Sequence, residues 1–157
     1  MPAQYMHCAL ANLHLRARAW GMATIADIRE IAADLPQLEE GISGYGTGAK
    51  WSVPRGMVIW RRPLGKTDTK RLVDQGLPIP QGEIYALRTA SETTKKELID
   101  AFEDLFFDIQ HLTGTDIVLF HLERIKVDQL REVIIEGWLA RVSSRAVNLR
   151  SETHPEQ

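Results

Sequence analysis

The stretch KWSVPRGMVIWR, residues 50–61, decides the fold. Two short runs, KWSV and MVIWR, carry β-branched and aromatic residues and are separated by Pro54, Arg55 and Gly56. Proline and glycine between two such runs are typical of a tight turn. The stretch therefore predicts a β-hairpin, around which the other elements can be arranged.

Two further strands follow the hairpin in the chain. The runs IYALRT, residues 84–89, and TDIVLFHL, residues 115–122, have the composition of strands. In the second run, Ile117, Leu119 and His121 fall on one side and the intervening residues on the other. The long connection between the hairpin and residue 84 is rich in glycine and proline, and we expect at most a short helical turn near Lys70–Val73.

Three helices complete the pattern. Thr24 and Ser91 are suited to helix N-caps, and Asp128 is expected to begin the last helix. Apolar residues recur at helical spacing in each segment; in the second helix they are Leu98, Phe102, Leu105 and Phe106. The element order predicts an α+β fold, an antiparallel β-sheet packed on one face by helices, with the other face open to a partner.

Length and composition are those of one domain with a hydrophobic core: 157 residues, 44% hydrophobic and 25% charged. We expect residues 1–21 to form a disordered extension preceding a start at Met22, residues 22–145 to form the domain, and residues 146–157 to form a frayed tail. The single cysteine, Cys8, and the absence of a long apolar run favour a cytoplasmic protein with no membrane association. A monomer is expected rather than an oligomer.

The glycines of residues 41–48 do not form a nucleotide-binding loop. A P-loop places lysine directly after glycine and a hydroxyl residue next, whereas Ala49 separates Gly48 from Lys50 and Trp51 takes the place of the hydroxyl. The loop also runs from a helix into strands, which is the reverse of the P-loop context. The glycines are interpreted as a flexible connection, and no cofactor is expected.

Positive charge is concentrated in one segment although the net charge is −2. Residues 50–71 hold one anion, Asp68, against seven cations: Lys50, Arg55, Arg61, Arg62, Lys66, Lys70 and Arg71. Cations gathered in this way can contact nucleic-acid phosphates, and Trp51 is the aromatic residue expected to stack on a base or face a groove. The alternative is a solvated surface with scattered ion pairs.

Several segments together resemble the MmcQ/YjbR family. They are ATIADIREIAADLPQLEEG (residues 23–41), GAKWSV (48–53), GMVIWRRPL (56–64) and the long stretch from FFDIQHLTG to EGWLA (106–140). The resemblance covers most of residues 24–145. In the loop DIQHLTGTDI, His111 and Gly114 are kept, but the prolines and tyrosine usual in the family are absent.

The resemblance implies a two-layer fold similar to a double-wing DNA-binding domain, and a non-catalytic protein that contacts DNA phosphates without reading sequence. The residues expected to bind DNA are Lys50, Trp51, Arg55, Arg61, Arg62, Lys66, Lys70 and Arg71. The alternative is a protein-interaction or small-ligand-binding module of the same fold with no nucleic-acid role.

Catalytic and metal sites are not indicated. Cys8 has no partner that can be placed, and Ser52 lacks the G-x-S-x-G context of a nucleophile. His111 is expected to line a cleft between the sheet and its loop, and His121 to be a neutral histidine with a satisfied hydrogen bond. Asp27, Glu30 and Asp34 share a helix face that is interpreted as solvated, so no metal is expected.

Overall fold

The structure, a computed structural model, describes residues 21–43 and 48–142. The expectations for the 1–21 extension, Gly21 apart, and for the 146–157 tail fall outside these residues. Within them, the helices and strands follow in the order α2 (Ile25–Ala33), β1 (Glu39–Ile42), β2 (Ala49–Val53), β3 (Gly56–Arg61), α3 (Lys66–Asp74), β4 (Ile84–Arg88), α4 (Glu92–Ala101), β5 (Phe106–Phe107), η1 (Gln110–Leu112), β6 (Ile117–His121), η2 (Leu122–Arg124) and α5 (Val127–Arg141).

The described strands form one antiparallel sheet in the order β1-β2-β3-β4-β6-β5, which confirms the predicted α+β class. The β2–β3 hairpin predicted from KWSVPRGMVIWR is present in this sheet and contains a bulge. Trp51 pairs with Ile59 while Ser52 pairs with Met57, so Val58 is an extra residue without a partner on β2. A bulge re-aims the side chain next to it, and both Val58 and Ile59 are accordingly buried in the main core.

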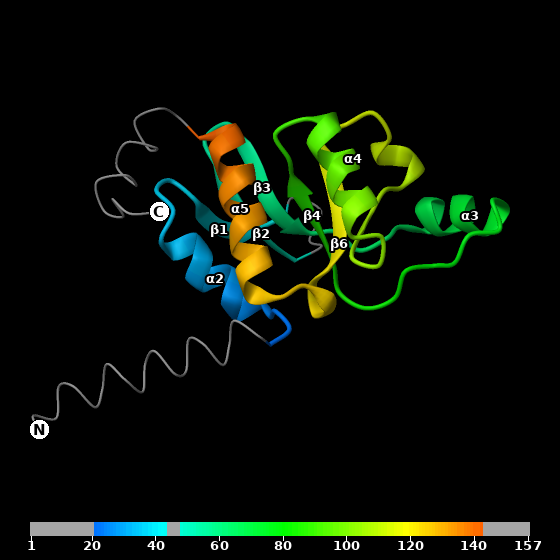
Figure 1. Ribbon diagram of the computed structural model, residues 1–157, viewed down its shortest axis with the longest axis horizontal. Helices are drawn as coiled ribbons and strands as arrows, with labels where there is room; N and C mark the ends of the chain where they lie inside the picture. Colours follow the sequence, from blue (N-terminus) through cyan, green and yellow to red (C-terminus); the bar gives the residue numbers. More distant parts are fainter. Residues whose placement is uncertain (1–20, 44–47, 143–157) are drawn as a thin grey trace, which may run out of the picture.

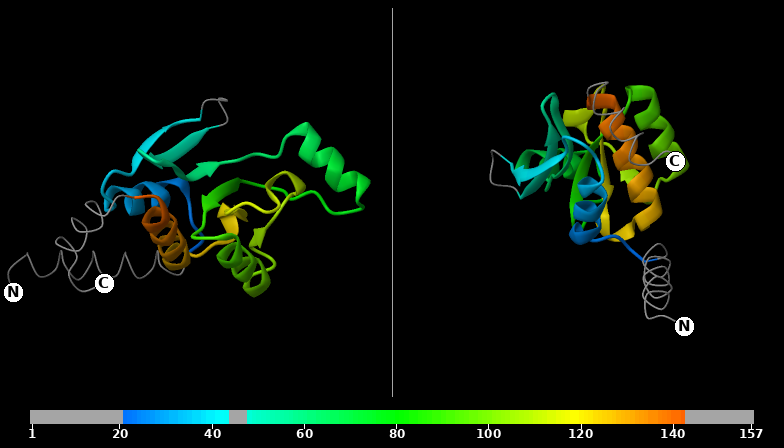
Figure 2. Two further views of the ribbon diagram at one scale, coloured as in Figure 1. Left: turned by 90° about the horizontal axis from the view of Figure 1, so that it is seen from above. Right: turned by 90° about the vertical axis from the view of Figure 1, so that its left-hand side faces the viewer.

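Helices α2, α4 and α5 cover one face of the sheet, as expected (Figure 1; Figure 2). Helix α5 packs unusually close to the sheet, because a Cβ atom on Gly137 would lie only 2.5 Å from the carbonyl oxygen of Arg88 in β4. The indole Nε1–H of Trp138 donates to the carbonyl of Pro36, at 2.8 Å, and so ties α5 to the end of α2. The main apolar core lies between these helices and the sheet.

The opposite face of the sheet is not fully open, which corrects the sequence-based expectation. Trp60, Ala86 and Leu119, on three neighbouring strands, form a second and smaller apolar cluster. Ile109 and Leu112, from the segment around η1, are buried in the same cluster. The loop between β5 and β6 therefore folds over part of this face, because the large side chains there need a cover.

Helix α3 projects from the rest of the molecule (Figure 1; Figure 2). It extends over nine residues where only a short turn near Lys70–Val73 was expected. Asp68 is its one buried residue, and the carboxylate accepts a hydrogen bond from the Gly65 backbone N–H at 3.1 Å, which caps the first turn. Its connection to the body includes a bond from Gln75 Nε2 to Gln110 Oε1 at 3.4 Å. A helix held this way is positioned mainly by its two flanking segments.

Three boundaries differ from those predicted. Strand β1 was missed, because its sequence EEGI has little strand character and forms through pairing with β2. Helix α4 ends at Ala101, so Phe102 is exposed and Phe106 belongs to β5. The last helix begins at Val127, one residue before Asp128. Among the described residues, no helix has the length and apolar character needed to cross a membrane.

Candidate functional site

The structure removes Trp51 from the expected DNA-contacting set. Its side chain is 1% exposed and lies in the main core, on the sheet face that the helices cover. The cause is the register: Trp51 is paired with Glu40 and Ile59 across β1 and β3, which points its ring to the same side as Ile59. A ring buried in this way cannot stack on a base.

Three of the seven cations are engaged in ion pairs. Arg61 Nε donates to Glu83 at 2.8 Å, Arg62 NH2 to Asp68 at 3.2 Å, and Lys70 Nζ to Asp74 at 3.1 Å. Each pair offsets a positive charge locally, although exposed pairs such as Lys70–Asp74 are weak and easily exchanged for a stronger anion. The positive field of this segment is therefore smaller than the sequence count indicated.

The other four cations have no ion-pair partner within the described residues, and they are spread over β2, the β2–β3 turn and α3. They are Lys50, Arg55, Lys66 and Arg71. Lys50 is in β2, where its side chain lies over Gly41 of β1. Arg55 is in the β2–β3 turn, and the other two are on α3. Helix α3, with its three basic residues, is the densest group.

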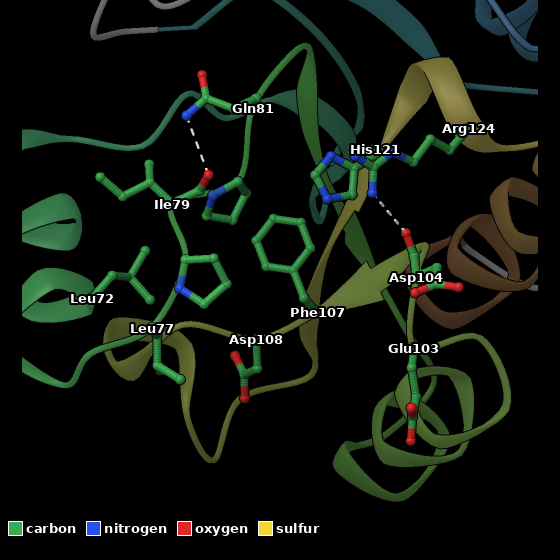
Figure 3. Close-up of a pocket in the computed structure, with 12 residues that line it drawn as sticks. Leu72, Leu77, Ile79, Gln81, Glu103, Asp104, Phe107, Asp108, His121 and Arg124 are labelled. Atoms are coloured by element: carbon green, nitrogen blue, oxygen red, sulfur yellow. Dashed lines mark hydrogen bonds between the residues drawn. The ribbon is translucent and has the colours of Figure 1, made fainter.

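A pocket of about 410 Å³ lies between the segment after α3 and the end of the sheet that carries β5 and β6. Such a volume is within the usual range for small-molecule sites. One wall is formed by Leu72 and the segment 77–81, and the other by Phe107, His121 and Arg124 (Figure 3). Residues from 72 to 124 in the sequence thus meet here because β4, β6 and β5 are neighbours in the sheet.

His121, at the end of β6, is the buried polar residue of this pocket. Its side chain is 8% exposed, and its ring centroid is 5.0 Å from that of Phe107. Burial lowers the pKa of the imidazole below its ordinary value of 6.5, and the positive charge of Arg124 lowers it further. A hydrogen bond with the Gln81 backbone and the charge of Glu123 oppose this shift. The imidazole is therefore neutral near pH 7.

Carboxylates outnumber cations at the pocket wall. Glu103, Asp104 and Asp108 line it together with one cation, Arg124. Arg124 NH1 donates to the backbone carbonyl of Asp104 at 3.2 Å. The Asp108 carboxylate forms an ion pair with the ammonium group of buried Lys95 at 3.0 Å. The carboxylates of Glu103 and Asp104 are exposed and have no ion-pair partner within the described part of the chain.

The pocket was not predicted from the sequence. His111, the residue expected to line a cleft, is exposed on η1 and is not part of this pocket; His121 is. One signal was available, because the apolar residues Leu77 and Ile79 occur in a polar, proline-rich connection. Their approach to Phe107 depends on long-range strand order, which no local pattern reveals.

Asp27, the first of the three acidic residues expected to share a face of α2, has a structural role. The Asp27 carboxylate accepts hydrogen bonds from the Thr24 backbone N–H at 2.8 Å and from its hydroxyl at 3.1 Å, and the residue is buried. This arrangement is a helix cap. Among the described residues, no group of three or more histidine, cysteine or acidic side chains is arranged to hold a metal ion.

The structure defines a small α+β domain with a surface pocket at one end of its sheet. No family model matches the chain, and no solved structure matches it. It is similar to the uncharacterized protein Rv2570 of Mycobacterium tuberculosis and to the uncharacterized protein Mb2600 of Mycobacterium bovis. Each is 33% identical over 126 residues, covering 80% of this chain and 94% of the relative. The chain belongs to the family of these mycobacterial proteins.

Proposed function

We propose that the protein is a non-catalytic DNA-binding domain of the MmcQ/YjbR type that contacts phosphates through α3 and the β2–β3 hairpin. The observation that carries the proposal is the projection of α3 from the body (Figure 2). A helix that stands clear of the body can approach a duplex without a clash between the sheet and the DNA. It carries Lys66, Lys70 and Arg71.

The positions of the cations on α3 support contacts with the DNA phosphate backbone. Lys66 and Lys70 are four residues apart and share a helix face. Lys66 is exposed and Arg71 half-buried, neither in an ion pair with any described residue, while Lys70 has only the exposed pair with Asp74. Exchange of the Asp74 carboxylate for a phosphate would cost little. Arg55, in the hairpin turn, supplies a further exposed contact.

The strength of such binding is set by the number of phosphates neutralised. The logarithm of the binding constant falls with the logarithm of salt concentration by roughly 0.9 for each phosphate contact on duplex DNA. For the three cations of α3 we therefore expect a slope of about −2 to −3. With so few contacts and a net charge of −2, binding is weak and not sequence-specific.

Fluorescence anisotropy with labelled duplex and single-stranded DNA, at several salt concentrations, tests this proposal. The double variant Lys66→Glu with Arg71→Glu is expected to abolish binding. Lys96→Glu is the matched control, because Lys96 is exposed on α4, on the helical face of the sheet, and its reversal should change binding little. Absence of binding at low salt, or an equal loss in both variants, would contradict the proposal.

A further inference from the structure

We propose that the pocket between the 77–81 segment and β5 binds a small organic amine, a ligand with an ammonium group on an apolar, flat body. This inference is independent of DNA binding, because none of the cations of α3 lines the pocket. Its basis is a cavity with apolar walls, a buried polar side chain and an excess of hydrogen-bond acceptors.

The walls determine the body of the ligand. Leu72, Leu77 and Ile79 form one side, and the half-buried ring of Phe107 faces them (Figure 3). Leu77 and Ile79 are 50% and 37% exposed and lie in the same short segment, so they form adjoining apolar surface that a ligand could cover. A flat apolar group inserted against Phe107 would remove these side chains from water.

The polar atoms determine its head group. Glu103 and Asp104 are exposed residues of the lining whose carboxylates only accept hydrogen bonds, and neither is in an ion pair among the described residues. Arg124 is the one cation of the lining, and one of its donors is already bonded to the Asp104 carbonyl. An ammonium group satisfies carboxylates and also interacts favourably with the face of an aromatic ring. A carboxylate or phosphate would be repelled by two unpaired anions.

His121 is the second observation that points to a ligand. The residue is more than nine-tenths buried and lines the pocket, with its ring beside that of Phe107. Among the described residues, no hydrogen bond joins a ring nitrogen of His121 to another side chain. A neutral imidazole with one N–H donor has one acceptor nitrogen left, which suits an N–H donor on a ligand.

Three indole compounds of nearly equal size separate the effect of charge from that of the apolar body. Tryptamine carries an ammonium group, tryptophol a hydroxyl and indole-3-acetate a carboxylate. Each is titrated into the isotopically labelled full chain, and the backbone amide signals of Phe107 and His121 are followed by NMR. Tryptamine is expected to saturate these signals at lower concentration than tryptophol, and indole-3-acetate to shift them least.

The double variant Glu103→Gln with Asp104→Asn tests the head-group assignment. Both residues are exposed, so the fold should be retained. Tryptamine affinity is expected to fall about tenfold to the level of tryptophol, since neutral amides cannot pair with the ammonium group, while tryptophol affinity stays unchanged. Glu97→Gln, at an exposed position of α4 outside the pocket, is the matched control and should leave all three titrations unchanged.

Two results would overturn the inference. One is binding of indole-3-acetate as tight as that of tryptamine, which would show that the acceptors do not select charge. The other is a lack of shifts at Phe107 and His121 with every compound, which would show that the pocket takes no ligand of this kind. Neither result bears on the DNA titrations, which use other residues and another probe.

Discussion

At the scale of single residues, His121 connects the pocket to the stability of the fold. Its lowered pKa means that the unfolded chain takes up a proton at a higher pH than the folded chain does. Stability contributed by the neutral imidazole is thus complete above about pH 6.5 and decreases as the pH falls from there toward the folded-state pKa. Below that value the loss is complete and no further change comes from this residue.

Urea unfolding between about pH 7.5 and pH 5 should reveal this linkage. His121→Gln, which removes the titrating group, is expected to give a flatter decrease of unfolding free energy with acidification than the wild type. His111→Gln is the control, because His111 is exposed on η1. Carboxylates contribute equally to all three chains, so equal slopes for the wild type and His121→Gln would show that His121 is not held neutral.

At the scale of elements, one buried lysine joins α4 to the segment around η1. Lys95 is 2% exposed; its Nζ donates to the Leu112 carbonyl at 2.7 Å and pairs with Asp108 at 3.0 Å. The adjacent Lys96 is 70% exposed and pairs with Glu92 one turn before it. Two consecutive lysines of the same helix therefore have opposite environments. Lys95 anchors the segment around η1, which covers the second apolar cluster.

Substitution of the two lysines by alanine should have unequal effects. Lys95→Ala removes two charge-assisted contacts of a buried ammonium group, although the Leu112 carbonyl still accepts from Thr115 and the Asp108 carboxylate from the Ile109 N–H. We expect a loss of about 2 to 3 kcal/mol in the free energy of unfolding. Lys96→Ala removes an exposed pair and should cost less than about 0.5 kcal/mol. Chemical denaturation of both variants provides the comparison. Similar losses at the two positions would refute a special anchoring role for Lys95.

At the scale of the whole molecule, the sheet is protected from edge-to-edge pairing. Edge strand β1 carries Glu39 and Glu40, and the opposite edge, β5, is only two residues long. Charges and short length are common means of keeping sheet edges apart. The exposed apolar residues Met22, Ile42, Phe102 and Leu139 belong to different elements, and isolated exposure of this kind is normal.

Sedimentation velocity should accordingly show a single-chain species at micromolar concentrations. If a dimer formed instead, two substitutions would locate its interface. Ile42→Lys would disrupt pairing at β1, whereas Leu77→Ser would disrupt a contact through the segment after α3, whose Val73, Leu77 and Ile79 are exposed. A stable dimer at low micromolar concentration would contradict the expectation of a monomer.

The elements that were predicted correctly are those whose formation depends on residues close together in the sequence. The β6 strand is a continuous run of apolar residues that ends in His121, and the Ser91 hydroxyl caps α4 by accepting from the Thr94 N–H at 3.1 Å. Burial of Trp51 depends on register, and β1 on a partner strand, so neither was apparent from local sequence. The pocket required the approach of residue 77 to residue 107, which follows from the full strand order. The DNA-binding role stays a prediction.

Helix α3 and its flanking segments connect β3 to β4, which are direct neighbours in the sheet. The hydrogen bonds between these two strands do not depend on the path that joins them, and each doubling of a loop's length costs only about 0.6 kcal/mol. Insertions in this connection should therefore leave the sheet pairing intact. Change in the protein over evolution can act on this connection, and thus on one wall of the pocket, without disturbing the core.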